Sequence, residues 1–256
     1  MNIKIGSVPY LNARPLIRWF STDDGQRSGV DVIEETPSRL AAMLDAEELD
    51  AALVSVYASF DHPEYTILPG VSISGQGEIK SVRAFSRLPF GMLHSIAMDT
   101  SSLTSVALLK ILLAEVYNSH PQAIAHAPNL DGMLRVADAA LLIGDPGMLA
   151  SDDGLRVLDL GEAWRKHVGL PFTYAVWLAR PGADTEMLAD ILRGARDYGL
   201  SQAPEIASEE ALRLGCSHEV CYEYVTEVMD YDLGDQHYEA ITTFHKKCRE
   251  NGLLSR

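Results

Sequence analysis

Apolar runs of strand length alternate with helical patterns along most of this chain. Strands are predicted at 3–8, 30–34, 50–56, 67–68, 71–74, 81–86, 95–98 and 139–143. Helices are predicted at 36–47, where Thr36-Pro37 is typical of a cap followed by a first-turn proline, and at 105–117. Alternation of this kind predicts an α/β fold in which each sheet is flanked by helices.

Two breaks divide the pattern. The first is Leu88-Pro89-Phe90-Gly91, and the second is Gly169-Leu170-Pro171, which precedes an aromatic-rich extended run at 172–179. We interpret the breaks as crossings between two lobes. Lobe 1 is then discontinuous and contains residues 1–88 and 172–256, whereas lobe 2 contains residues 89–171. The neighbourhoods 88–91 and 179–182 are the expected hinges.

The pattern after Asp184 is almost wholly helical, which predicts a helical C-terminal segment. On the last predicted helix, apolar residues recur at spacings of three and four. These residues, predicted to form one buried stripe, are Tyr238, Ile241, Phe244 and Cys248.

The junction between the first predicted strand and the first predicted helix carries an amide side chain, Asn12. Such junctions are where open α/β sheets bind ligands. Pro15 suits the first turn of the following helix. Asn12 is therefore either a ligand-binding group or a cap of this helix, and capping alone is the common role of Asn at this place.

A second polar cluster follows the strand predicted at 95–98. Five of the six residues from 100 to 105 carry hydroxyl groups, although a helix cap needs only one. Hydroxyls beside free backbone amides at a helix N-terminus suit a carboxylate or a phosphate. The absence of phosphate-loop glycines favours a carboxylate.

Further polar candidates follow or precede other predicted strands. Ser81 and Ser86 lie in one strand, where alternation places them on opposite faces, so both contact a ligand only if the strand bends or ends between them. Asp145 follows a buried strand and suits either a ligand hydroxyl or a helix cap. Tyr174 lies beside the second crossing, where it either closes a cleft or packs.

Composition and charge narrow the partners. The chain has 256 residues, of which 47% are hydrophobic and 22% charged, so a folded globular protein is expected. With 36 acidic against 21 basic residues, the formal charge is -15, and no cluster of Lys and Arg offers a nucleic-acid surface. The apolar runs are too short and too charged for membrane insertion.

Cysteine usage and the N-terminal residues indicate a compartment. The three cysteines, Cys216, Cys221 and Cys248, form no disulfide framework, and their spacing from His218 and His245 matches no usual zinc site. No metal ligands are therefore assigned. The N-terminal residues do not have the pattern of a secretory signal, so a cytoplasmic location is predicted.

An ordered series of motifs gives the chain a family resemblance over about its first 180 residues. The series consists of Ser7-Val8-Pro9-Tyr10-Leu11-Asn12-Ala13-Arg14-Pro15-Leu16, Leu68-Pro69-Gly70-Val71-Ser72-Ile73-Ser74 with Gly77, Ser81-Val82, Phe85-Ser86-Arg87, Thr104-Ser105, Leu141-Leu142-Ile143-Gly144-Asp145, Asp159-Leu160-Gly161-Glu162-Ala163-Trp164, Leu170-Pro171-Phe172 and Ala175-Val176-Trp177. The chain thereby resembles the chorismate dehydratases of the futalosine route to menaquinone. It departs from their pattern at Arg83-Ala84, usually two aliphatic residues, and at Pro146-Gly147, usually an alanine-rich helix start.

The resemblance implies a two-lobe fold like that of the type II periplasmic binding proteins. It also implies a hydro-lyase that removes water from chorismate to give 3-[(1-carboxyvinyl)oxy]benzoate. Because this elimination yields an aromatic ring, no metal, redox group or other cofactor is expected. The partner is a small dianionic substrate, and a monomer or a homodimer is expected.

The candidate residues follow from the motifs. Asn12 is the catalytic candidate, since it suits the departing hydroxyl or the enolpyruvyl group. The candidate substrate contacts are Tyr10, Ser81, Ser86, Thr104, Ser105, Asp145 and Tyr174. None of these positions offers His, Lys or Glu as a general base, so we hypothesise that the enolpyruvyl carboxylate of the substrate takes the proton.

Two other classes of function share this architecture, because a fold alone does not decide function. One is a non-catalytic small-carboxylate-binding protein of the solute-receptor type. The other is a ligand-sensing regulatory domain, which is disfavoured because no DNA-binding segment is recognisable in the sequence. Turnover of chorismate distinguishes the enzyme from both.

Overall fold

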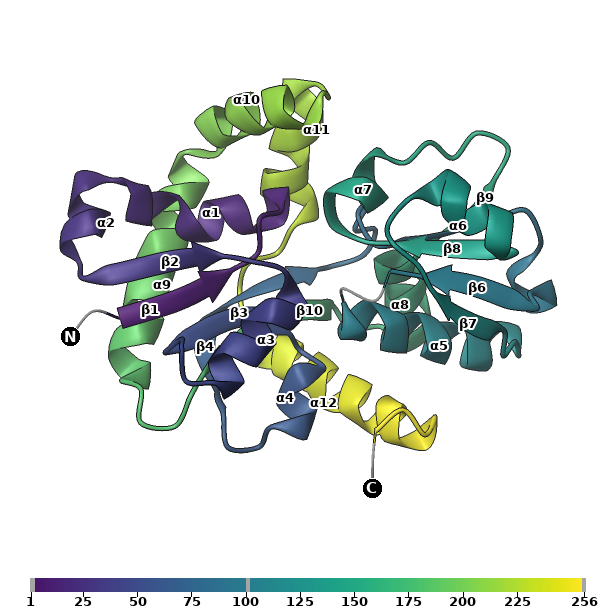
Figure 1. Ribbon diagram of the computed structural model, residues 1–256, viewed down its shortest axis with the longest axis horizontal. Helices are drawn as coiled ribbons and strands as arrows, with labels where there is room; N and C mark the ends of the chain where they lie inside the picture. The colour runs from purple at the N-terminus through teal and green to yellow at the C-terminus, as the bar shows by residue number, and fades with distance from the viewer. Residues whose placement is uncertain (1–2, 100–101, 255–256) are drawn as a thin grey trace. The chain divides into compact units, whose positions relative to one another are not determined.

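The computed structural model describes residues 3–99 and 102–254, which form two compact units (Figure 1). Unit 1 consists of Met1–Ser74 and Thr173–Asp235, and unit 2 of Gly75–Phe172 and Gln236–Arg256. Each unit has its own five-stranded sheet flanked by helices.

The sheet of unit 1 has the strand order β2-β1-β3-β10-β4. Its strands are β1 (Ile3–Ser7), β2 (Val30–Glu34), β3 (Ala51–Ser55), β4 (Thr66–Gly75) and β10 (Phe172–Ala179). β1 runs parallel to β2 and β3, whereas β10 runs antiparallel to β3. The apolar run of β3 is buried, as is typical of a parallel strand that is covered on both faces.

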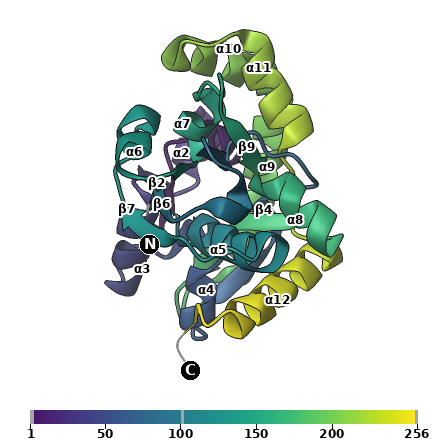
Figure 2. The same ribbon diagram turned by 90° about the vertical axis from the view of Figure 1, so that its right-hand side faces the viewer.

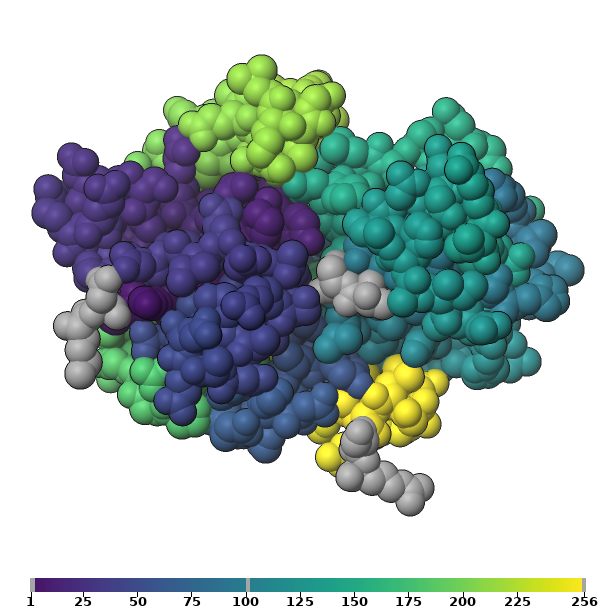
Figure 3. Space-filling view, viewed as in Figure 1, coloured from purple at the N-terminus to yellow at the C-terminus, as the bar shows by residue number. Residues whose placement is uncertain are grey.

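Helices cover both faces of this sheet (Figure 1). They are η1 (Leu11–Ala13), α1 (Arg14–Ile17), η2 (Arg18–Ser21), α2 (Asp23–Arg27), α3 (Pro37–Asp45), α4 (Ala58–Asp61), α9 (Thr185–Ser201), α10 (Ala203–Leu214), α11 (His218–Glu223) and the π-helical turn η4 (Tyr224–Val228). α3 packs on β1 and β3, and α9 packs on α1. α10 lies over α1 at the surface of the unit, in green in Figure 3, where Arg18 pairs with Glu209.

The sheet of unit 2 has the strand order β7-β6-β8-β5-β9. Its strands are β5 (Arg83–Ser86), β6 (Ser95–Met98), β7 (Gln122–Ala125), β8 (Ala139–Leu142) and β9 (Arg156–Asp159). β6 runs parallel to β7 and β8, while β5 runs antiparallel to β8 and β9. Its helices are η3 (Phe90–Met92), α5 (Leu103–Tyr117), α6 (Leu130–Val136), α7 (Gly144–Leu149), α8 (Leu160–Val168) and α12 (Asp235–Glu250).

The last helix, α12, packs beside α5 and α8 of unit 2 (Figure 2). Trp164 of α8, Phe172 and Phe244 of α12 pack edge to face, with ring centroids 5.0 to 6.1 Å apart. Such contacts add to the burial of these large rings. The final helix therefore belongs to the core of unit 2.

The boundaries of the two units differ from the expected lobes in two places. The first crossing lies at Ser74, not at Leu88, because β5 pairs with β8 and β9 of the second sheet. The second difference is the C-terminal helix, which was expected in lobe 1 and packs in unit 2. The second boundary lies between Phe172 and Thr173, one residue after the expected start of the second part of lobe 1.

Local differences have simple causes. The two short strands at 67–68 and 71–74 are one strand, β4, which continues through Gly70 at φ 89°. Tyr238 is 38% exposed and not part of the buried stripe of α12. His237 and Ala240 take its place beside Ile241, Phe244 and Cys248, because the buried face is rotated by one position.

A carboxylate anchors α12 and gives a stability prediction. Glu115 of α5 accepts hydrogen bonds from His167 Nε2 at 2.7 Å, from Asn251 Nδ2 at 2.9 Å and from Lys247 Nζ. Burial raises the pKa of Glu115, but these hydrogen bonds outweigh burial and hold its pKa below the ordinary value of 4.5. The stabilisation is thus present above the pKa of an unfolded glutamate and is lost as the pH falls through the folded-state pKa.

We expect Glu115→Gln to lower the free energy of unfolding by about 1 kcal/mol at pH 7, since it loses the charge-assisted hydrogen bonds. In urea titrations, the difference in the free energy of unfolding between this variant and the wild type should become smaller as the pH falls below about 4. Glu250→Gln is the control, because within the described residues Glu250 makes only an exposed pair with Lys246 on the same helix. A difference at pH 7 that persists unchanged at low pH contradicts this account.

Among the described residues, no helix is both long and apolar enough to cross a membrane. The cytoplasmic location stays a prediction.

Candidate active site

The candidate residues of unit 1 lie at one edge of its sheet. β1 ends at Ser7 and β3 at Ser55, and these strands are parallel, so both carboxyl ends meet at this edge. β10 runs the other way, and its start lies at the same edge, where Val56 N donates to Tyr174 O at 3.1 Å. The segment that carries Tyr10 and Asn12 leaves the sheet here, at the place where α/β sheets bind ligands.

Asn12 lies inside the 3-10 turn η1 and does not cap a helix. Tyr10 is the N-cap of η1 and Ala13 the N-cap of α1, and neither has a side-chain cap. Asn12 Oδ1 is buried and has no hydrogen-bond partner among the described residues. The capping alternative is therefore wrong. Leaving a buried acceptor unpaired costs about 1–3 kcal/mol, so Oδ1 stays a candidate for a ligand contact.

A second orphaned group lies at the end of β1. Ser7 Oγ is fully buried and, within the part of the chain that the structure describes, has no hydrogen-bond partner. Sequence reasoning did not select Ser7 as a site residue. The pattern offered only a small polar residue at a strand end, which is common without any ligand.

The two tyrosines differ in exposure. Tyr10 is partly exposed at the start of η1. Tyr174 is 7% exposed within β10. Packing therefore accounts for most of the surface of Tyr174, and only its edge position connects it with Tyr10.

The candidate residues of unit 2 also gather at one sheet edge, with one exception. β6 and β8 end here at Met98 and Leu142, while the antiparallel β5 starts here at Arg83. Ser81 precedes β5, Thr104 and Ser105 follow β6, and Asp145 follows β8. The exception is Ser86, which lies at the far end of β5 opposite Ala139.

Ser86 has a structural role in the turn that follows β5. Its Oγ donates to Leu88 O at 2.8 Å and accepts from Leu88 N at 3.0 Å, and Asp138 O lies 3.3 Å away. Ser81 and Ser86 thus lie at opposite ends of β5, because the strand starts only at Arg83. We therefore leave Ser86 out of the candidate site.

The hydroxyl run contains a helix cap and two buried candidates. Ser102 is the N-cap of α5, with its Oγ accepting from Ser105 N at 3.3 Å and lying 3.0 Å from Ser105 Oγ. Thr104 and Ser105 are buried in the first turn. Thr100 and Ser101 lie outside the described residues. The Ser102 hydroxyl thus caps the helix, as expected for one residue of the run. Thr104 and Ser105 remain candidates for ligand binding at a helix N-terminus.

Asp145 is buried in the first turn of α7, whose N-cap is Ile143. The two departures from the family pattern meet at this helix. Arg83 Nε and Nη2 donate to Gly147 O at 2.8 and 2.6 Å, and Nη2 also donates to Met148 O and Ala150 O. Arg83 thereby caps the carbonyl end of α7.

Asp159 is a residue of this edge that sequence reasoning missed. It ends β9 and caps α8, its Oδ1 accepting from Glu162 N at 3.0 Å. The same carboxylate accepts from Ile79 N at 3.1 Å and from Lys80 N at 2.8 Å. Burial raises the pKa of Asp159, against the opposing effect of these backbone amides. The Asp159–Glu162 spacing predicts a cap, but not the contact with residues 79–80.

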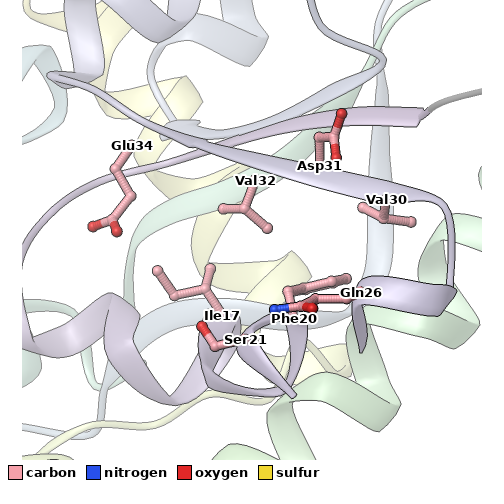
Figure 4. Close-up of a pocket in the computed structure, with 8 residues that line it drawn as sticks. All are labelled: Ile17, Phe20, Ser21, Gln26, Val30, Asp31, Val32 and Glu34. Carbon is pink, nitrogen blue, oxygen red and sulfur yellow. The ribbon is translucent and has the colours of Figure 1, made fainter. Parts of the chain in front are cut away.

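One described pocket of unit 1 lies elsewhere, between β2 and the helices α1 and α2 (Figure 4). Its volume is about 370 Å³, and Asp31 and Glu34 are among its lining residues. Glu34 pairs with Arg14 at 2.6 Å. The carboxylates repel a dianion, and none of the candidate residues lines this pocket, so it is not assigned to the substrate.

The described chain also contains histidines and cysteines outside the candidate residues. His94 and Asp138 are adjacent to the opposite edge of the second sheet, and His167 pairs with Glu115. Burial raises the pKa of the Cys248 thiol to about 12, so this thiol is protonated at neutral pH. Cys216 and Cys221 form no disulfide, and their Sγ atoms lie 3.3 Å apart, where either thiol can donate a hydrogen bond to the other.

Comparison with known proteins identifies the family. A family model described as menaquinone biosynthesis matches residues 3–250. The chorismate dehydratase of Thermus thermophilus is 32% identical over 230 residues, covering 82% of each chain. The chorismate dehydratase of Campylobacter jejuni is 27% identical over 173 residues, covering 66% of this chain and 64% of its own.

Solved structures confirm the fold. A crystal structure of a protein from Archaeoglobus fulgidus aligns with a TM-score of 0.81 at 17% identity, covering 98% of both chains. The periplasmic aliphatic sulphonate binding protein SsuA of Escherichia coli aligns with a TM-score of 0.69 at 15% identity, covering 99% of this chain and 88% of its own. The fold is thus that of the periplasmic binding proteins, and the chain belongs to the menaquinone-biosynthesis family that includes the chorismate dehydratases.

Proposed function

We propose that this protein is a chorismate dehydratase, a hydro-lyase that converts chorismate into 3-[(1-carboxyvinyl)oxy]benzoate. The observation that carries the proposal is the 32% identity to a chorismate dehydratase over 82% of both chains. The orphaned acceptor of Asn12 supports it, because this side chain needs a ligand donor.

The chemistry of Asn12 suits this substrate. An amide oxygen can only accept hydrogen bonds, and so can an ionised carboxylate. Asn12 Oδ1 therefore cannot pair with either carboxylate of the ionised substrate. The ring hydroxyl is the only strong donor of the chorismate dianion. We therefore assign Asn12 Oδ1 to the departing hydroxyl, which leaves Nδ2 free to donate to the enolpyruvyl carboxylate.

Unit 2 contributes donors for a carboxylate. Ser81, Thr104 and Ser105 have hydroxyls, and the last two lie in the first turn of the 15-residue helix α5, where the helix dipole favours a negative charge. We assign them to the ring carboxylate, into which negative charge spreads during elimination. Tyr10, Tyr174 and Asp145 are proposed as further substrate contacts.

The proton step needs no group beyond the substrate. The enolpyruvyl carboxylate takes the proton from the ring carbon that bears the side chain, and the electron pair of that bond forms the new ring double bond. The neighbouring carbon–oxygen bond breaks, and the hydroxide takes up the proton and leaves as water. Formation of the aromatic ring supplies the driving force. The protein accelerates the reaction by holding the carboxylate and the ring proton in the geometry that the proton transfer requires. Independence of a cofactor is part of this proposal.

Mass spectrometry of a chorismate incubation tests the proposal. The expected product has lost one water and keeps the enolpyruvyl group. A fragment without the side chain, or an isomer of unchanged mass, indicates a different reaction. Saturable binding in calorimetry with no product identifies a solute-binding protein instead.

Ser81, which precedes β5, and Ser86, at the end of β5, provide a matched pair of variants. We expect Ser81→Ala to raise KM about 10-fold or more, because a hydrogen bond to a charged group contributes about 1.5–3 kcal/mol. Ser86→Ala loses the contacts of Oγ with Leu88 and Asp138 and no proposed substrate contact, so KM stays unchanged while the free energy of unfolding falls by about 1 kcal/mol. Steady-state kinetics and urea titration of both variants check this. An equal effect of the two variants on KM contradicts the assignment of Ser81.

A further inference from the structure

The backbone just before Ser81 is held in an unfavourable conformation. Lys80 has φ 61°, one of three non-glycine residues with positive φ in the described chain. This region costs a residue with a Cβ roughly 1–2 kcal/mol, so the surroundings of Lys80 must hold it there. Strain of this kind is concentrated at functional sites.

The Asp159 carboxylate supplies the restraint on the N-terminal side of Ser81. It accepts from the backbone amides of both Ile79 and Lys80, and its side chain is buried. The third amide on the same carboxylate is that of Glu162, at the start of α8. Asp159 therefore ties the strained segment to the first turn of α8.

The C-terminal side of Ser81 is restrained by α7. A Cβ on Gly147 would lie 2.2 Å from Ser81 O and 2.9 Å from Leu142 O, so the backbone of α7 lies directly against Ser81. The Arg83 guanidinium fixes the other end of α7 through its three carbonyl partners. Ser81 is thus held from both sides, by the Asp159 carboxylate and by the backbone of α7.

We propose that Asp159 is a positioning residue, which holds Lys80 in the left-handed conformation and so presents the Ser81 hydroxyl to the substrate carboxylate. The inference rests on the proposed function of Ser81. Besides capping α8, Asp159 acts through the 79–81 backbone, so its loss weakens substrate binding and leaves the chemical step intact.

A double-mutant cycle tests this role. The Asp159→Asn variant keeps the shape of the side chain but has only one acceptor oxygen, because the NH2 group that replaces the second oxygen cannot accept a hydrogen bond. We expect Asp159→Asn to raise KM for chorismate about 5- to 10-fold with kcat changed less than about 2-fold. In the Ser81→Ala background the same change alters KM less than about 2-fold, because the positioned hydroxyl is already gone.

Asp138→Asn is the matched control. Asp138 makes the same kind of contact at the opposite edge of the sheet, where its Oδ2 accepts from His94 N at 2.9 Å and from Ser95 N at 3.0 Å. Its loss is expected to lower stability and leave KM unchanged. A rise in KM for Asp138→Asn as large as that for Asp159→Asn would assign the effect to general destabilisation and overturn the proposal.

A rescue variant keeps the test decisive if Asp159→Asn folds poorly. Glycine adopts positive φ without strain, so Lys80→Gly removes the need for the restraint. We expect Lys80→Gly with Asp159→Asn to recover most of the lost affinity for chorismate. If Asp159→Asn and Ser81→Ala raise KM independently, so that their effects multiply in the double variant, the positioning role of Asp159 is overturned. If the wild-type protein shows no turnover of chorismate, the proposed function is overturned instead.

Discussion

Replacing Asn12 by alanine is expected to lower kcat/KM for chorismate by about 100- to 1000-fold, the loss typical when one preorganised hydrogen-bonding group at a reacting centre is removed. Asn12 holds both groups that react: Oδ1 accepts from the departing hydroxyl, and Nδ2 orients the carboxylate that takes the proton. Because Oδ1 has no partner among the described residues, the variant loses no internal hydrogen bond of that oxygen. Since the variant also removes an orphaned buried acceptor, its free energy of unfolding should be no lower than that of the wild type.

Two further variants separate the roles of the Asn12 side chain. Asn12→Asp keeps the shape of the side chain but adds a negative charge and removes the Nδ2 donor. Its loss of turnover should therefore be at least as large as that of Asn12→Ala. Asn129→Ala is the control, because Asn129 is a true N-cap whose Oδ1 accepts from Gly132 N at 2.7 Å. We expect it to cost about 1 kcal/mol of stability without a change in turnover. Near-normal turnover of Asn12→Ala, with turnover abolished by substitution of a neighbouring Glu or His, would show that the enzyme supplies its own base.

The second large effect is expected at Gly199, on the helix α9. A Cβ there would lie 1.8 Å from Pro15 O and 2.6 Å from the Pro15 carbonyl carbon. The backbone of α1 cannot rotate away as a side chain can, so Gly199→Ala must separate α9 from α1. We expect a loss of about 3 kcal/mol in the free energy of unfolding, at the upper end of overpacking effects. Turnover falls as well, since α1 follows directly on the turn that carries Asn12.

Gly194 is a matched control on the same helix. Nothing lies within 4 Å of the Cβ that Gly194→Ala would introduce. The substitution should therefore stabilise the protein by about 0.5–1 kcal/mol, because alanine favours the helix and restricts the unfolded chain. Urea titration of both variants measures the contrast. Two stabilising substitutions, or two equally destabilising ones, contradict the close packing of α9 on α1.

Elements with a strong local pattern were predictable from the sequence. The strand at 172–179 matches β10 residue for residue, and the apolar run at 50–56 contains β3. The order of the motifs led to the family that the comparisons show. Strands β7 and β9 were missed, because each has only four residues and little apolar periodicity.

The parts of the site that depend on distant contacts were not predictable in the same way. Spacing predicts that Asp159 caps α8, but its second contact, with Ile79 and Lys80, joins residues about eighty positions apart. Likewise, Ser81 and Ser86 lie in one predicted strand, and only the late start of β5 at Arg83 separates a candidate ligand group from a turn residue. A single sequence carries no signal for such pairings.

If this protein is a chorismate dehydratase, it removes the ring hydroxyl of chorismate as water and keeps the side chain. Proton NMR of chorismate incubated with the purified protein distinguishes this reaction from all others. We expect the ring signals of chorismate to be replaced by those of an aromatic ring while the vinyl signals of the enolpyruvyl group persist. Unchanged chorismate signals in the presence of folded protein that binds the ligand would contradict it.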